Sequence, residues 1–217
     1  MKKYIAFFDI DNTVISATSG KVMAANGYRE GLISNLNLIE GIVLSLLYRF
    51  KLMKSENVIK LMARWLKGIS EKEILDFSTR LFDEHLKDKI REKARSEINF
   101  HNTNGGLTVI LSATTRYLSE LIKQHLGMDD IICSELEVID GYYSGLPLGN
   151  YCYGEEKLIQ AEKFCEKHGY DLKEAYYYGD SASDIPVLEV VGYPMCVTPD
   201  RKLEKVAVEK GWDICKW

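Results

Sequence analysis

Short apolar runs alternate with segments of helical periodicity over the second half of the chain. Leu107–Leu111 and Ala175–Tyr178 are typical of buried strands, and Tyr4–Phe8 near the start has the same character. Helical periods over 116–125 and 155–168 are each followed closely by a glycine, a residue that commonly ends a helix. Strands that alternate with helices predict parallel βαβ units, so we expect a doubly wound, mostly parallel α/β sheet.

Four further features extend this pattern toward the end of the chain. Glu135–Gly149 has the character of two short strands around an Asp-Gly dipeptide, which favours a tight hairpin turn. A helix is expected over 180–191 and a last strand over Tyr193–Val197. Thr198-Pro199 then predicts the N-cap and first-turn proline of a terminal helix.

Residues 14–104 differ from the rest because they show helical periods and almost no strand signal. Ser70 to Glu73 match a capping box, a motif that begins a helix. The stretch is far too long for an ordinary connection between a strand and a helix. We therefore predict a helical cap domain over residues 14–104, inserted into a Rossmann-like core formed by residues 1–13 and 105–217.

The composition is ordinary for a globular protein and shows no electrostatic footprint for nucleic acid. The 217 residues are 46% hydrophobic and 28% charged, with a formal net charge of −4. The longest apolar stretch, Leu36–Met53, is interrupted by polar and charged residues, so we do not expect it to span a membrane. A half-buried helix is favoured there, and an apolar surface that meets a lipid substrate is the alternative.

Cysteine and histidine positions give no sign of a disulfide framework or a zinc site. The five cysteines are odd in number and form no Cys-x-x-Cys pair, which suits a reducing compartment. The apolar run before Asp9 is also too short for a signal peptide, so we expect a cytoplasmic protein. The four histidines show no ligand spacing and are expected at the surface: His85, His101, His125 and His168.

Two carboxylates, Asp9 and Asp11, follow the first predicted strand directly. Burying a bare carboxylate is costly, and a hard cation such as Mg2+ would offset that cost. Taken alone, the pair could also start a turn with Asn12. Two other predicted strands end at polar groups as well, namely Ser112 and Asp180. Because ligands bind at the carboxyl ends of strands in open α/β sheets, we expect these groups to form one site.

These residue types match the requirements of phosphoryl transfer. One carboxylate can act as a nucleophile and form an acyl phosphate, and a second can act as general acid and then base. Mg2+ would offset the repulsion between an anionic nucleophile and an anionic phosphate. A hydroxyl such as Ser112, and a lysine such as Lys157 near the start of a predicted helix, can hold the phosphoryl oxygens. Asp184, four residues after Asp180, could belong to this site, or it could cap or brace the helix that reaches Leu188.

The segments that carry these residues also resemble a known family. FFDIDNTV, LSAT, the lysine of CYGEEK and YYYGDSASDIP occur in the order and spacing of the haloacid dehalogenase superfamily. They are most similar to its phosphoserine-phosphatase-like branch, subfamily IB, which has a helical cap between the first and second motifs. The resemblance covers nearly the whole chain. It implies a phosphoric monoester hydrolase that acts on a small phosphorylated substrate.

By position, the resemblance implies a role for each candidate residue. Asp9 would be the nucleophile and a Mg2+ ligand, and Asp11 the general acid/base whose backbone carbonyl also binds Mg2+. Asp180 would be the second carboxylate on the metal, with Asp184 orienting either a water on the metal or the lysine. An aspartate at position 11 favours a phosphatase over a dehalogenase, because an alkoxide leaving group needs a proton and a halide does not. Two residues would bind the phosphoryl group: Ser112 and Lys157.

One position departs from the pattern of phosphoserine phosphatases. These enzymes carry a glutamate in the cap soon after the first motif, where it meets the substrate ammonium group, and Thr18 stands there in this chain. We therefore expect phosphoserine not to be the best substrate. A lipid-phosphate phosphatase, a phosphotransferase with the same site and a non-catalytic metal- and phosphate-binding module are the alternatives. The sequence contains no signal for the oligomeric state.

Overall fold

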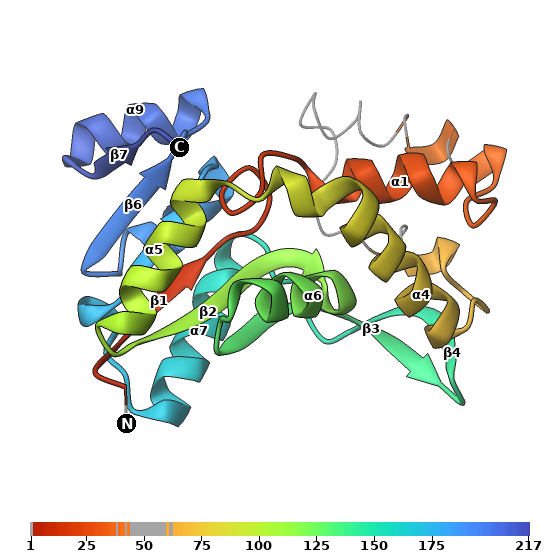
Figure 1. The fold of residues 1–217 in the computed structure, drawn as a ribbon, viewed down its shortest axis with the longest axis horizontal. Coiled ribbons are helices and arrows are strands. Elements are labelled where there is room, and N and C mark those ends of the chain that lie inside the picture. Colours follow the sequence, from red (N-terminus) through yellow and green to blue (C-terminus); the bar gives the residue numbers. More distant parts are fainter. Residues whose placement is uncertain (1, 38, 42, 44–59, 61–62) are drawn as a thin grey trace.

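A computed structural model describes residues 2–37, 39–41, 43, 60 and 63–217. In this part of the chain the centre of the fold is a seven-stranded sheet with the order β4-β3-β2-β1-β5-β6-β7 (Figure 1). Neighbouring strands are parallel except for the antiparallel pair β3–β4. The predicted doubly wound, mostly parallel α/β fold is confirmed. The strands are β1 (Tyr4–Phe8), β2 (Gly106–Thr115), β3 (Asp130–Ile139), β4 (Tyr142–Leu148), β5 (Tyr176–Gly179), β6 (Tyr193–Val197) and β7 (Asp213–Cys215).

Helices cover both faces of this sheet. One face carries α5 (Glu92–Thr103) and α6 (Arg116–Leu126). The opposite face carries α7 (Glu155–His168), α8 (Ile185–Leu188) and α9 (Arg201–Lys210). The other described helices are α1 (Ser19–Arg29), α4 (Glu71–Leu81), the π-helix η1 (Phe82–Leu86) and the 3-10 turns η2 (Lys87–Lys89), η3 (Leu172–Glu174) and η4 (Ala182–Asp184).

β1 is a continuous apolar run because both of its faces are buried. Ala6 and Phe8 contact the layer that contains α5 and α6, whereas Ile5 and Phe7 contact the layer that contains α7 to α9. Central parallel strands that are covered on both sides lose the alternation of apolar and polar residues. Because β1 is packed on both faces, its end fixes the position of Asp9, the residue that follows it.

Several element boundaries differ from the sequence predictions. β2 continues to Thr115, so Ser112 lies within the strand and not after it. The helix expected over 180–191 is divided into η4 and α8, and α8 ends at Leu188. The strand β7, which pairs with β6, was not predicted. Three residues are too few to display a period, so this strand has no recognisable local pattern.

Asp200 is the N-cap of the terminal helix, and the prediction of Thr198 for this role is wrong. The Asp200 carboxylate accepts hydrogen bonds from the backbone N–H groups of Lys202 and Leu203, at 2.9 and 2.8 Å. The N–H of Thr198 instead donates to the carbonyl of Cys215 on β7 at 2.7 Å. Pairing between β6 and β7 therefore extends past the residue that sequence rules favour, and the helix begins two residues later.

The elements of the predicted cap region occupy two positions. α1 and α4 lie beyond the carboxyl ends of the central strands, whereas α5 lies across the sheet (Figure 1). Ala94 and Ile98 of α5 are fully buried in the core of the sheet domain. Ser70 caps α4 by accepting a hydrogen bond from the N–H of Glu73 at 3.1 Å, at the start that the capping box predicted. The cap boundaries at 14 and 104 stay a prediction.

The β3–β4 hairpin contacts the segment that leads into α4. Its turn residues Asp140 and Gly141 both have positive φ angles, 51° and 80°, as the predicted tight turn requires. The N–H of Tyr143 on β4 donates to the carbonyl of Ile69 at 3.0 Å, and the N–H of Gly68 donates to the carbonyl of Tyr143 at 2.9 Å. The hairpin edge is thus hydrogen-bonded to the segment that leads into α4.

Most of the Leu36–Met53 segment, predicted as a half-buried helix or a lipid-facing surface, lies outside the described residues. Of the helices in the described ranges, none has the length and apolar character that crossing a bilayer requires.

His101 is fully buried, and the expectation that it lies at the surface is wrong. Its Nδ1 is 3.0 Å from the hydroxyl oxygen of Tyr4, and its Nε2 is 3.0 Å from that of Tyr178. Burial lowers the pKa of His101 to about 4. The inner face of α5 carries three buried residues at the spacing i, i+4, i+7, namely Ala94, Ile98 and His101. This spacing is the sequence signal that could have indicated a buried His101.

We expect His101 to contribute to the pH dependence of stability. In the unfolded chain an imidazole has an ordinary pKa of about 6.5, so the unfolded state binds a proton first as the pH falls. The stabilisation is fully present above the unfolded pKa and is lost as the pH falls toward about 4. One pKa unit corresponds to about 1.4 kcal/mol, so the loss amounts to roughly 2–3 kcal/mol.

Urea unfolding at pH 7 and pH 4 measures this contribution. The free energy of unfolding should fall less between the two pH values in His101→Gln than in the wild type. The exposed His168 provides the control, because His168→Gln should keep the wild-type dependence. An equal fall in wild type and His101→Gln would contradict the assignment.

Candidate active site

Asp9 and Asp180 follow the adjacent strands β1 and β5, and Ser112 lies within the neighbouring strand β2. β1 lies between β2 and β5, and Phe8 is in register with Ile110 on one side and Tyr178 on the other. Asp9 directly follows β1, and its N–H donates to the carbonyl of Tyr178 at 2.9 Å. Asp180 directly follows β5. The expectation that separate strand ends would deliver polar groups to one edge thus agrees with this arrangement.

Lys157 forms a buried ion-pair cluster with two carboxylates. Its Nζ is 2.8 Å from Asp9 Oδ1 and 2.7 Å from Asp184 Oδ1, and the lysine is 2% exposed. Burial alone would lower the pKa of Lys157, but the charges of Asp184 and Asp9 outweigh burial and raise it well above its ordinary value. The lysine is therefore charged, and it lies in the first turn of α7 where the sequence placed it.

Asp184 holds this lysine in place. Its Oδ1 accepts hydrogen bonds from Lys157 Nζ and, at 2.6 Å, from the Tyr177 hydroxyl. Its Oδ2 accepts from the N–H and the hydroxyl of Ser181, at 3.1 and 3.2 Å. Each oxygen of Asp184 thus accepts two hydrogen bonds, and these four bonds from protein groups use the acceptor positions of the carboxylate.

Tyr177 is a site residue that the sequence did not reveal. It is fully buried, and its hydroxyl is 3.1 Å from Lys157 Nζ. A run of three tyrosines predicts packing in a sheet, and the middle one faces the layer opposite to its two neighbours. Gly179 makes room for it, because a Cβ there would lie 2.8 Å from the Asp184 carboxyl carbon and from the Tyr177 ring. No local pattern identifies the partner of a buried hydroxyl.

Three carboxylates, those of Asp9, Asp180 and Asp184, have oxygens within 4.8 Å of one another. Burial raises the pKa of Asp9 to about 6, and it raises that of Asp180 to about 8 with the added repulsion of Asp9 and Asp184. Because the oxygens of Asp184 are already hydrogen-bonded, Asp9 and Asp180 are the better pair to share a cation. These two desolvated carboxylates repel each other. Their oxygens are hard ligands, which is the type that Mg2+ prefers.

Asp11 faces the cap. Its Oδ1 accepts a hydrogen bond from the N–H of Ser19, the first residue of α1, at 2.9 Å. The Ser19 hydroxyl lies 3.2 Å from Thr114 Oγ1, and Ser112 Oγ lies 3.3 Å from the same atom. Burial raises the pKa of Asp11 above its ordinary value. Ser19 and Thr114, which the sequence did not single out, therefore connect Asp11 to Ser112 across the junction between cap and core.

The family model for haloacid dehalogenase-like hydrolases matches residues 6–189 of this chain. The match includes the ends of β1, β2 and β5 and the helix α7, which carries Lys157. The chain belongs to this family.

Individual relatives add the type of enzyme. The chain is 29% identical over 218 residues to the phosphoserine phosphatase SerB1 of Mycobacterium tuberculosis, covering 96% of this chain and 69% of the relative. It is 27% identical over 217 residues to a histidinol-phosphatase of Neisseria meningitidis, covering 98% of each. A crystal structure of a Bordetella pertussis protein of unknown function matches with a TM-score of 0.91 at 23% identity, over 99% of both chains. The predictions of the family and of a phosphatase are confirmed.

Proposed function

We propose that this protein is a Mg2+-dependent phosphatase that hydrolyses a small phosphomonoester through a phosphorylated Asp9. The observation that carries the proposal is the contact between Asp9 and Lys157 at 2.8 Å, deep in the carboxyl edge of the sheet. A buried cation beside a carboxylate can draw an anionic phosphoryl group to that carboxylate. The names of the two relatives, a phosphoserine phosphatase and a histidinol-phosphatase, support a small phosphorylated substrate.

In the first step Asp9 attacks phosphorus, so an O–P bond forms while the ester P–O bond breaks. Asp11 gives its proton to the departing oxygen. Its burial and raised pKa favour the protonated carboxyl that this role needs. In the second step Asp11, now ionised, takes a proton from water, which attacks phosphorus and releases phosphate from Asp9.

The other site residues bind and orient. Lys157 and Ser112 donate to phosphoryl oxygens, where charge is spread in the transition state. Asp184 and Tyr177 hold the lysine through hydrogen bonds of 2.7 and 3.1 Å to its Nζ. Asp9, Asp180 and the backbone carbonyl of Asp11 would hold Mg2+. The bound ion would neutralise charge between nucleophile and phosphate.

Release of inorganic phosphate from a panel of phosphate esters tests this function. We expect turnover in Mg2+ that falls to background when EDTA removes the ion, and that returns when Mg2+ is restored. Thermal unfolding under each condition checks that the chelator has not unfolded the protein. A folded protein that releases no phosphate from any ester, or that works equally well in EDTA, would contradict the proposal.

A further inference from the structure

A cavity of about 170 Å³ lies beside Asp11, between the cap helices α1 and α4 and the ends of β2 and β3. Its walls are mainly apolar. Among the residues that the structure describes, Asp11 is the one charged side chain that lines it. The large apolar side chains in its wall include Met23, Leu32, Trp65, Leu66, Ile74 and Phe77.

The position of this cavity matters for the proposed reaction. Asp11 is both a wall of the cavity and the residue proposed to protonate the leaving oxygen. Ser19 and Thr114, which connect Asp11 to Ser112, line the same cavity. The alcohol part of the substrate is attached to that leaving oxygen, so it must extend from Asp11 into this space.

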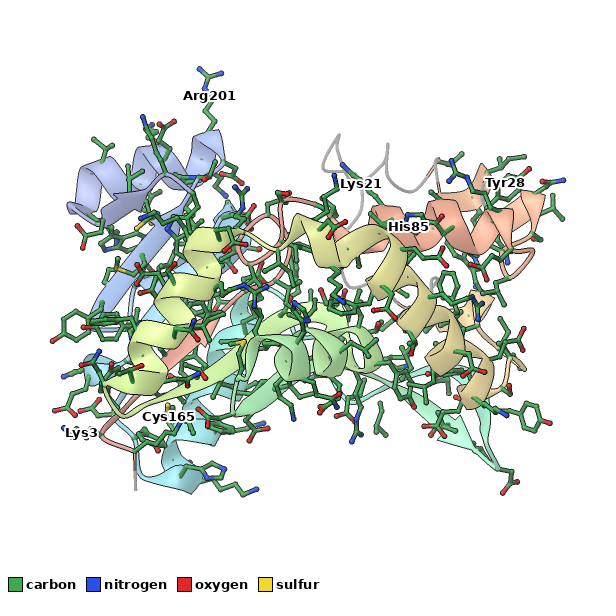
Figure 2. The ribbon with its side chains drawn as sticks, in the orientation of Figure 1. Lys3, Lys21, Tyr28, His85, Cys165 and Arg201 are labelled. Carbon is green, nitrogen blue, oxygen red and sulfur yellow. The ribbon has the colours of Figure 1, made fainter. Side chains whose placement is uncertain are left out.

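In the described part of the chain, three charged residues near the cavity either have a partner or are exposed to solvent. Arg116 lies 3.6 Å from the Glu135 carboxylate, and Glu71 accepts a hydrogen bond from the Tyr117 hydroxyl. Lys21, labelled in Figure 2 on the first turn of α1, is exposed to solvent. Asp11 lies at the leaving oxygen in the proposed reaction, so it is not placed to meet a charge farther along the alcohol. Among the described residues, a charged group farther along the alcohol would therefore find no counter-ion and would be desolvated at a cost.

We propose that the substrate is a water-soluble phosphomonoester whose alcohol part is an uncharged alkyl or aryl group. This inference rests on the proposed function, because it assigns the cavity to the leaving group of that reaction. Apolar walls with a few convergent polar groups are the usual design of a site for such a ligand. The absence of an acidic residue at Thr18, where phosphoserine phosphatases hold an ammonium group, is consistent with it.

A series of n-alkyl phosphates from methyl to hexyl tests the proposal with the wild-type protein. Each buried methylene is worth about a fourfold gain. Burial of only two to three of the five added methylenes would therefore raise kcat/KM about 30-fold from methyl to hexyl phosphate, and we expect at least that rise. Phenyl phosphate should also exceed methyl phosphate, whereas phosphoserine and phosphoethanolamine should fall below hexyl phosphate. A flat series, or phosphoserine as the best substrate, would overturn the inference. Turnover confined to phosphatidic acid in vesicles would overturn it as well.

Two neighbouring alanines of α1 offer a matched pair of variants. Ala24 lines the cavity, whereas Ala25 is exposed and does not. Ala24→Glu should lower the hexyl-to-methyl ratio of kcat/KM at least about tenfold, because it places a carboxylate among apolar walls. Ala25→Glu carries the same change at the next residue and should keep the wild-type ratio. Equal ratios in the two variants would count against the cavity as the leaving-group site.

Binding of non-hydrolysable phosphonates separates this inference from the proposed function. Calorimetry in Mg2+ should show hexylphosphonate binding at least about tenfold more tightly than 2-aminoethylphosphonate. If no ester is hydrolysed but this preference holds, the proposed function fails and the apolar site stands. If methyl phosphate is hydrolysed but the preference is absent or reversed, the function stands and the inference fails.

Discussion

Asp9→Asn is expected to lose at least about 10⁴-fold in kcat for phosphate release, because an amide does not form the acyl phosphate. Asp9 is 6% exposed, and asparagine has nearly the same size and shape. The remaining oxygen can still contact Lys157, so the fold should persist. Steady-state phosphate release in saturating Mg2+ gives the loss, and circular dichroism with thermal unfolding shows that the variant is folded.

Asp11→Asn is the matched control, with the same change two residues along the same loop. With p-nitrophenyl phosphate, whose leaving group needs little protonation, this variant should release about one equivalent of nitrophenol rapidly and then turn over slowly. The slow phase reflects the missing base for hydrolysis of the acyl phosphate. Asp9→Asn should show no such burst. A burst in Asp9→Asn as large as that in Asp11→Asn would assign the nucleophile to another residue.

The second large effect concerns stability. We expect Lys157→Met to lower the free energy of unfolding by about 3–5 kcal/mol, because it leaves two buried carboxylates without their counter-ion. Asp9 and Asp184 are 6% and 0% exposed, so water cannot replace the lysine at either oxygen. Methionine keeps the length of the side chain, which limits the effect of lost packing. Urea unfolding at pH 7 without Mg2+ measures the change.

A double-mutant cycle separates the ion pair from other effects of the substitution. Adding Asp184→Asn to Lys157→Met removes one of the stranded charges and should recover about 1–3 kcal/mol. Both proteins should remain inactive, since the lysine is also proposed to bind the phosphoryl group. Lys163→Met, on an exposed position of the same helix, should change stability by less than about 0.5 kcal/mol. A Lys157→Met protein as stable as the wild type would refute the buried ion pair.

Local patterns were sufficient for the main strands and for the positions of Asp9 and Asp180 directly after β1 and β5, whereas Ser112 lies within β2 and not after it. β1 is buried on both faces, and this burial leaves a continuous apolar run that can be read without a structure. Parallel strands have their carboxyl ends at one edge, so residues at those ends come together whatever the details of packing. Element ends were less predictable, as Thr198 and Asp200 show, because pairing with β7 competes with the local capping preference.

Contacts between distant segments could not be predicted in this way. Tyr177 lies in the site, and its hydroxyl contacts Lys157 on another element. His101 lies in the core, and its ring contacts Tyr178 on another element. Ser19 and Thr114 are 95 positions apart and meet only where the cap rests on the core. A serine or a threonine has no local signature of such a role.

The order of apolar and polar residues thus determined the fold class and the identity of the carboxylates, because burial and strand ends are marked locally in the chain. The tertiary structure decided that both oxygens of Asp184 are hydrogen-bonded and that Asp11 lies beside an apolar cavity. Lys157 reaches Asp9 across 148 positions, and the apolar cavity is assembled from α1, α4 and two strands. Such arrangements depend on how the elements pack, and packing is settled by the free energy of the whole molecule, not by any one segment.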